Sequence, residues 1–279
     1  MIMQSKVLMV VTYLYFAASI LYVAAWIFKK ELAGKIATWL TIIGLAGNLT
    51  GMLMRWVESY RMGIGHAPLS NMYESLVFFA FTIVALYLYM EFRYKYRTIG
   101  AVVVPVAFLT MAYASLPGIS GRIQPLLPAL KSNWLIGHVF TCFLGYAAFA
   151  MAFCISILYL IKIKEKIDKE NSIISRLPPV EILDELNHRL IMFGFLFLTI
   201  GIITGSVWAN SAWGKYWSWD PKETWSLITW LIYALLLHAR LMRGWNGQRI
   251  AYISIVGFIA VLFTYFGVNT LLPGLHSYA

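Results

Sequence analysis

The chain has 279 residues, of which 61% are hydrophobic and only 12% are charged, and its formal net charge is +10. An ordinary soluble domain is about one-quarter charged and roughly half apolar, so this composition excludes a typical soluble protein. The charge would suggest a nucleic-acid partner in a soluble protein, but here the basic residues occupy short loops between long apolar runs, where Lys and Arg orient membrane proteins. We therefore predict an all-α, polytopic integral membrane protein without a nucleic-acid partner.

Long apolar runs follow one another along the chain, each able to span roughly 30 Å of hydrocarbon. The first run lacks a small-residue cleavage signature, so we interpret it as a retained helix rather than a signal peptide. We expect a single transmembrane domain over residues 1–279. The eight predicted spans are 7–28, 37–57, 71–92, 98–116, 133–161, 189–209, 223–242 and 250–271.

The orientation follows from the basic residues, most of which fall in alternate loops. One of these loops, 162–187, is the most strongly charged stretch and contains KIKEKIDKE. By the positive-inside rule these loops are cytoplasmic. Both termini and the loops near 58–70, 117–132 and 210–222 are then expected to face outward.

The two cysteines, Cys142 and Cys154, both fall in the fifth predicted span. Twelve residues of helix separate two positions by roughly 18 Å. That distance is too long for a disulfide, so we expect both thiols to pack in the protein interior.

A tryptophan-rich outer loop, predicted over 208–225, joins the sixth and seventh spans. An interfacial aromatic belt at headgroup level is one interpretation. The density of the rings favours a second one, in which a flat aromatic platform holds a large planar apolar ligand against water. The aromatic residues are Trp208, Trp213, Tyr216, Trp217, Trp219 and Trp225.

The polar residues after these rings predict a helix start. Asp220 at the N-cap, Pro221 at the first helical position and Glu223 at the third form a strong start signal. Lys222 could in addition pair with a propionate group of a ligand. The outer loop before the third span predicts a helix start of the same kind, with Asn71 as the N-cap and Glu74 at the third helical position.

The predicted topology places the five histidines at different depths in the membrane. His138, His276 and His66 lie toward the outer face, and His138 and His276 converge on the face that carries the tryptophan loop. His238 lies roughly 22 Å along the seventh helix, in the inner half of the membrane. His188 falls at the cytoplasmic start of the sixth helix, where we interpret it as structural.

Ionisable side chains within a span are rare and usually functional, which draws attention to His138 and His238. Two neutral imidazoles form a natural axial ligand set for heme iron. Zinc is the competing metal, but it usually has three or four ligands, and no HxxxH or HExxH spacing supports it. A structural, hydrogen-bonded role remains the alternative for each histidine.

Several motifs together resemble a known family. WGKYWSWDPKETW at 213–225 resembles the "WWD" signature of membrane heme-handling proteins in cytochrome c maturation. GHAPLSNMYESLVFF at 65–79, LLLHAR at 235–240 and LHSY at 275–278 resemble its CcsA branch. This branch is also called ResC-type, and CcsB in some bacteria. The resemblance covers essentially the whole chain.

The resemblance implies a membrane location and partners. The protein would lie in the bacterial cytoplasmic (inner) membrane with an extracytoplasmic active face. It would pair with a CcsB/ResB-type membrane subunit and serve apocytochrome c, with thiol-reducing proteins as indirect partners. Together the two subunits would form a system II holocytochrome c synthase, in which this chain presents heme b for thioether attachment to CxxCH.

The resemblance also implies roles for residues. His138 and His276 would be the axial ligands of the outer heme, and His238 would ligate an intramembrane heme whose opposite ligand comes from the partner subunit. Heme is a substrate in transit, and no catalytic group of the chain's own is expected, because the substrate's cysteines are the nucleophiles. We expect further heme contacts from Trp213, Tyr216, Trp217, Trp219, Asp220 and Lys222.

Three other functions are weighed against this one. A heme exporter or chaperone without ligase activity would use the same residues. A transporter for another solute usually shows paired repeats and broken helices, and we see neither in the sequence. A scaffolding protein would leave the tryptophans and the outer histidines unexplained.

Overall fold

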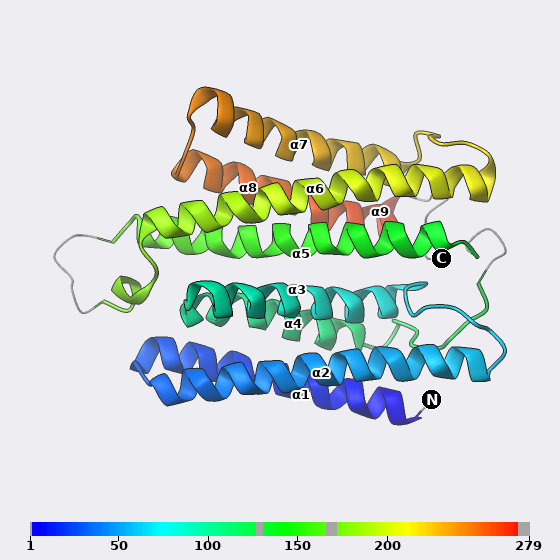
Figure 1. Ribbon diagram of the computed structural model, residues 1–279, viewed down its shortest axis with the longest axis horizontal. Helices are drawn as coiled ribbons and strands as arrows, with labels where there is room; N and C mark the ends of the chain where they lie inside the picture. Colours follow the sequence, from blue (N-terminus) through cyan, green and yellow to red (C-terminus); the bar gives the residue numbers. More distant parts are fainter. Residues whose placement is uncertain (1, 127–130, 166–171, 273–279) are drawn as a thin grey trace. The chain divides into compact units, whose positions relative to one another are not determined.

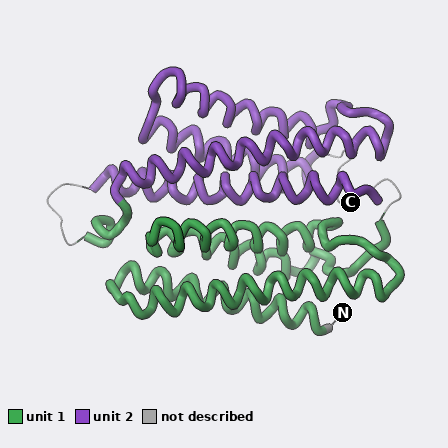
Figure 2. The backbone as a smooth tube through the Cα atoms, in the orientation of Figure 1, with its two compact units in different colours: residues 1–127, 170–178 green, residues 128–169, 179–279 purple. Residues whose placement is uncertain are grey.

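A computed structural model describes residues 2–126, 131–165 and 172–272, and throughout these ranges the regular elements are helices. The chain forms two compact units (Figure 2). Unit 1 comprises Met1–Leu127 and Glu170–Pro178, and unit 2 comprises Pro128–Lys169 and Pro179–Ala279. Eight helices of the described ranges are long and apolar enough to cross a membrane, so the all-α, multi-pass prediction is confirmed.

Unit 1 contains four of these helices (Figure 1). Helix α1 packs along both α2 and α4, and α3 packs along α4. A 3-10 turn, η1, leads directly into α4, and a second one, η3, belongs to the short segment that returns to this unit. The bounds are α1 Ile2–Phe28, α2 Glu31–Arg61, α3 Met72–Tyr94, η1 Arg97–Ile99, α4 Gly100–Ala114 and η3 Ile174–Arg176.

Unit 2 contains the other four spans (Figure 1). Helix α5 runs along α6, and α8 packs against α5 and α7. The last span changes from α to a single π turn, η4, before it ends in the short helix α9. The bounds are α5 Asn133–Lys162, α6 Val180–Trp213, α7 Pro221–Arg243, α8 Gln248–Leu262, η4 Phe263–Gly267 and α9 Val268–Leu271.

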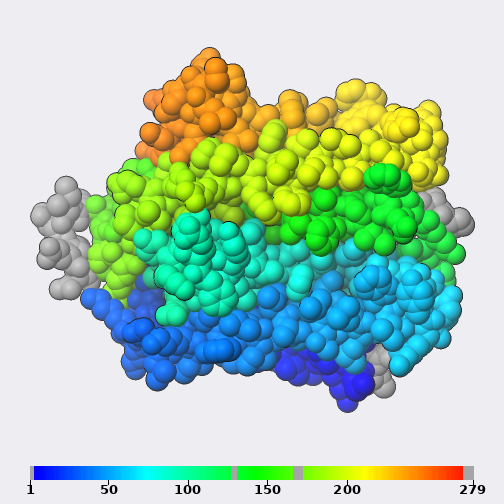
Figure 3. All heavy atoms as spheres, in the orientation of Figure 1, coloured from blue at the N-terminus to red at the C-terminus, as the bar shows by residue number. Residues whose placement is uncertain are grey.

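Large apolar side chains are exposed along the helices. Helix α2, which lies on the face of unit 1 visible in Figure 3, exposes Leu32 at 70% and Trp39 at 65%. Exposed apolar surface of this extent would favour aggregation in water, whereas a bilayer is its natural environment.

Helix α6 is longer at both ends than the predicted span 189–209, which changes the boundaries of two predicted loops. It begins at Val180, inside the predicted charged loop 162–187, and continues to Trp213, inside the predicted loop 208–225. The extension at the start of α6 is supported by an ion pair in which Asp184 accepts from Arg240 at 2.7 and 3.0 Å. Hydropathy follows the apolar middle of a helix and does not detect ends that are stabilised by such pairs.

Candidate functional site

His138 lies near the start of α5, the helix that runs along α6 (Figure 1). Ser132 caps this helix by accepting from the backbone N–H of Trp134 at 3.2 Å. The imidazole Nδ1 of His138 lies 2.7 Å from the carbonyl oxygen of Gly201 on α6. Because a carbonyl oxygen only accepts, Nδ1 is the donor, and the neutral ring keeps its lone pair on Nε2. Metal-binding histidines commonly donate the N–H of one ring nitrogen to a carbonyl in this way, which fixes the tautomer and orients the ring.

Small residues on α6 make room for this ring. A Cβ at Gly205 would lie 2.6 Å from His138 Nδ1, and a Cβ at Gly201 would lie 2.5 Å from Cys142 Sγ. Cys142 and Cys154 are buried and form no disulfide, in agreement with the packing role predicted for both. The ring of Trp208 stacks on His138 with centroids 6.0 Å apart and an interplanar angle of 16°. The seam between α5 and α6 therefore fixes both the position and the tautomer of the histidine.

A cavity of about 120 Å³ opens beside His138 within unit 2. It is walled by α5, α6, the segment between α6 and α7, the start of α7 and the π turn after α8. Residues that line it include His138, Phe143, Tyr146, Gly205, Ser206, Tyr216, Trp217, Lys222, Glu223, Thr264 and Tyr265. Mostly apolar walls with a few polar groups are typical of a small-molecule site.

The tryptophan-rich segment is less planar than predicted. Trp208 and Trp213 belong to α6 and meet edge to face, with centroids 5.0 Å apart and rings at 72°. Trp217 and Trp219 are also perpendicular, at 5.7 Å and 89°. Aromatic quadrupoles favour such edge contacts over a continuous flat surface.

These rings also differ in their position relative to the cavity. Tyr216 and Trp217 line it, although Tyr216 is 59% exposed, whereas Trp219 is 68% exposed and lies outside the lining. The platform is therefore a set of perpendicular rings, of which Tyr216 and Trp217 face the cavity.

The segment is held in place by the start of α7, as the sequence predicts. Asp220 accepts from the backbone N–H of Lys222 at 2.9 Å, and Glu223 Oε2 accepts from the backbone N–H groups of Ser218 at 2.7 Å and of Asp220 at 3.3 Å. With Pro221 at the first helical position this is a full capping box. The cap employs the carboxylate of Asp220, and this residue lies outside the lining of the cavity.

Several cavity residues were not predicted from the sequence, and two of them, Thr264 and Tyr265, belong to the π turn. Thr264 Oγ1 lies 3.1 Å from Thr229 Oγ1 and donates to the carbonyl of Ala260 at 2.8 Å, which ties the turn to α7. Tyr265 lines the cavity and meets Phe143 edge to face at 5.8 Å. Single π turns inside α-helices often occur at functional sites, but no pattern in the residues announces this one.

The remaining histidines of unit 2 that the structure describes do not lie with His138 at the cavity. His238 is exposed on α7 and lies outside the cavity lining, and His276 falls outside the described residues. His188 is half-buried on α6. In the described part of the chain no three His, Cys, Asp or Glu side chains converge as a metal-binding group.

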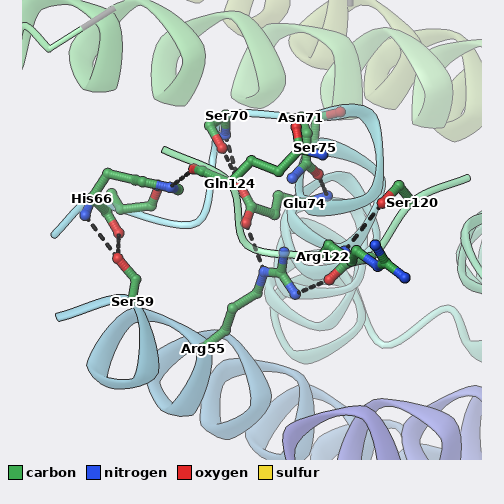
Figure 4. A network of polar contacts seen from close by, with 12 residues as sticks. Arg55, Ser59, His66, Ser70, Asn71, Glu74, Ser75, Ser120, Arg122 and Gln124 are labelled. Carbon is green, nitrogen blue, oxygen red and sulfur yellow. Dashed lines mark hydrogen bonds and ion pairs between the residues drawn. The ribbon is translucent and has the colours of Figure 1, made fainter. Parts of the chain in front are cut away.

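The motif at 65–79 builds a polar network in unit 1 (Figure 4). Asn71 caps α3 by accepting from the backbone N–H of Glu74, as predicted, at 2.9 Å. Glu74 in turn accepts from Ser70 and forms a buried ion pair with Arg55 at 2.6 Å. The ring nitrogens of His66 lie 2.8 Å from the carbonyl of Ala67 and 3.0 Å from that of Gln124. The motif thus fastens two loops to the ends of α2 and α3.

Comparisons with known proteins agree with this architecture. Residues 69–276 match the family of cytochrome C assembly proteins. The cytochrome c biogenesis protein CcsA of Guillardia theta is 44% identical, over 80% of this chain and 79% of that protein. The CcsA proteins of Trieres chinensis and Prochlorococcus marinus are 40% and 43% identical, over 95% and 81% of this chain and 93% and 78% of their own lengths.

A solved structure shares the fold. Cytochrome c heme lyase CcmF superposes with a TM-score of 0.73 at 15% identity, over 95% of this chain. The present chain spans only 46% of the length of that lyase, and the likeness concerns the fold alone. The sequence matches establish that the chain belongs to the cytochrome c assembly protein family, as a CcsA-type member.

Proposed function

We propose that this CcsA-type protein is the heme-handling subunit of a cytochrome c synthetase, which presents heme b at the outer membrane face to apocytochrome c. One observation carries the proposal: His138 stands beside an aromatic cavity with Nδ1 bonded to the Gly201 carbonyl, 2.7 Å away, and with Trp208 stacked on its ring. In this tautomer Nε2 is the acceptor nitrogen of the ring, and it would be the atom that binds iron as an axial ligand.

The cavity residues have complementary roles in this proposal. Tyr216 and Trp217 would exclude water from one face of the heme, and Lys222 would pair with a propionate. At about 120 Å³ the cavity is smaller than the roughly 300–1,000 Å³ of typical ligand sites, so it would enclose only part of the macrocycle. The second axial ligand would be His276. An incompletely enclosed heme leaves its vinyl groups accessible to a protein substrate.

The bond-forming step needs no nucleophile from this chain. Each cysteine of a CxxCH motif adds its S–H across one heme vinyl group, so that sulfur bonds to one carbon and the hydrogen to the other, without a net transfer of electrons. The contribution of this protein would be positioning and electronic control of the iron through the His138 ring. The histidine of CxxCH would replace an axial ligand as the product forms.

His238 would act separately, at an intramembrane heme site. Its exposure on α7 supports this assignment, because a partner of the CcsB/ResB type could supply the opposite ligand to an exposed imidazole. The location of the outer site is part of the same proposal, since it rests on the distribution of Lys and Arg.

The test is a set of visible spectra of the purified chain, with and without a CcsB/ResB-type partner. The wild type should show sharp, split α and β bands when reduced, and His138→Ala should lose or shift them, whereas the control His188→Ala should not. An unchanged spectrum and heme content in His138→Ala would refute the assignment. Maturation of a reporter cytochrome c then separates a synthetase subunit from a heme carrier, since only the former needs to support thioether formation.

A further inference from the structure

A strongly basic pocket lies in unit 1, at the end of the bundle where α1 joins α2 and α3 leads into α4 (Figure 1). Its volume is about 270 Å³. Four cationic side chains line it, Lys29 and Lys30 from the first connection and Lys95 and Arg97 from the second, against a single carboxylate, Glu31. The pocket is separate from the cavity beside His138, since none of its lining residues belongs to unit 2.

The charges in and around this pocket leave an excess of positive potential. Glu31 is paired with Lys35 at 3.0 Å, and the buried Glu91 accepts from Arg97 Nε at 3.1 Å. Within the described ranges no ion pair involves Lys29, Lys30 or Lys95. Three ammonium groups around one hollow repel one another unless an anion lies between them.

The backbone adds hydrogen-bond donors to the same pocket. Helix α2 begins here, and its N-cap residue Lys30 makes no side-chain capping bond. Lys30, Glu31 and Gly34 line the pocket, so the positive end of this long helix lies at its wall. The hydroxyl oxygen of Thr98, which also lines the pocket, is buried without a hydrogen-bond partner among the described residues. Amides at a helix start, a hydroxyl and ammonium groups are the donors that bind phosphate oxygens.

Two of the lysines stand where glycine is the usual residue. Lys29 and Lys95 have φ angles of +55° and +64°, in the left-handed region. Lys95 ends α3 by donating its N–H to the carbonyl of Glu91 at 2.8 Å, a position that glycine normally occupies. The presence of lysine at both strained positions indicates a requirement for the side chains themselves.

We propose that this pocket binds a phosphoryl group, supplied by the headgroup of an anionic phospholipid or by a free phosphate ester. The four cations and the α2 amides surround the phosphate oxygens, and the Thr98 hydroxyl donates to one of them. The site is independent of heme handling. It anchors unit 1 where its basic connections meet the lipid headgroups.

The left-handed backbone at the two lysines permits a clean test. In Lys29→Gly/Lys95→Gly two cations are lost while the new residues suit the existing conformation, so the fold is retained. The control, Lys164→Gln/Arg243→Gln, removes the same number of charges from exposed positions of unit 2. Native mass spectrometry of the full chain in a nonionic detergent then measures binding of phosphatidylglycerol and of phosphatidylcholine. Sodium phosphate is added as competitor at constant ionic strength.

Phosphatidylglycerol should bind the wild type and the control equally and the glycine variant about 30-fold more weakly, since each lysine near an anionic lipid contributes about a factor of five. Displacement by sodium phosphate would show that the phosphoryl group suffices, and retention of the lipid would identify the whole headgroup as the ligand. Equal affinity of the glycine variant and the control, or equal binding of phosphatidylcholine and phosphatidylglycerol, would overturn the proposal.

Discussion

Gly205→Ala is expected to displace His138 and so to weaken heme binding. The new Cβ would lie 2.6 Å from Nδ1 and 2.7 Å from Cε1 of the imidazole, whereas ordinary contacts are 3.4–4 Å. The ring or α6 must therefore shift by about 1 Å, which takes the bond from Nδ1 to the Gly201 carbonyl, now 2.7 Å, beyond the range of about 2.7–3.2 Å for a good hydrogen bond. Overpacking of this kind costs about 1–3 kcal/mol.

If the whole cost falls on heme binding, it lowers the affinity for heme by about 5- to 150-fold. The matched control is Gly137→Ala, one residue before His138, where a Cβ would meet nothing within 4 Å. Both changes raise helix propensity by a similar amount, so their difference isolates the contact with the imidazole. The assay is heme content per protein together with the reduced spectrum. Wild-type heme content in Gly205→Ala, or an equal loss in Gly137→Ala, would refute the reasoning.

Three further predictions concern other contacts. Trp208→Phe should retain heme but shift its reduced bands, because a smaller ring then stacks on the axial histidine; identical spectra would contradict this role. Glu74→Gln should destabilise the protein by about 3–5 kcal/mol by leaving the buried Arg55 without its counter-ion, while Glu31→Gln, at an exposed pair, should leave the melting temperature in detergent nearly unchanged. The Trp219→Gly variant should have a melting temperature no lower than that of the wild type, but it should support maturation of less reporter cytochrome c. Full maturation would argue against a role for this ring.

The features that the sequence predicted well depend on local chemistry. The apolar runs predicted all eight spans, because a bilayer leaves few alternatives to a continuous helix. The starts of α3 and α7 were predicted correctly from Asn71 and Asp220, since capping uses residues within one turn. The start of α6 was not, because an ion pair of Asp184 with Arg240, which is distant in sequence, stabilises it.

The candidate site was predictable only in part. His138 and the tryptophan cluster could be selected, but Trp208, placed where the predicted span 189–209 and the predicted loop 208–225 overlap, was not expected to stack on His138. A signal for it was present: Gly201, Gly205 and Trp208 follow one another at steps of four and three residues, which places them on one helix face. Thr264 and Tyr265 reach the cavity because of a π turn, for which the residues give no comparable signal.

Trp219 links the local conformation of this segment to its proposed use. Its φ of +59° is unfavourable for a bulky side chain, and its ring is 68% exposed, so burial of the ring does not compensate for the strain. A protein under selection for stability alone would place glycine here. Glycine does occupy the other left-handed position of this segment, Gly214, six residues before the capping residue Asp220. Strain that packing does not explain is typical of sites where a ring must meet a ligand or another protein. The same reasoning applies to Lys29 and Lys95 at the basic pocket, so among the described residues the left-handed non-glycine positions lie in the tryptophan-rich segment and at this pocket.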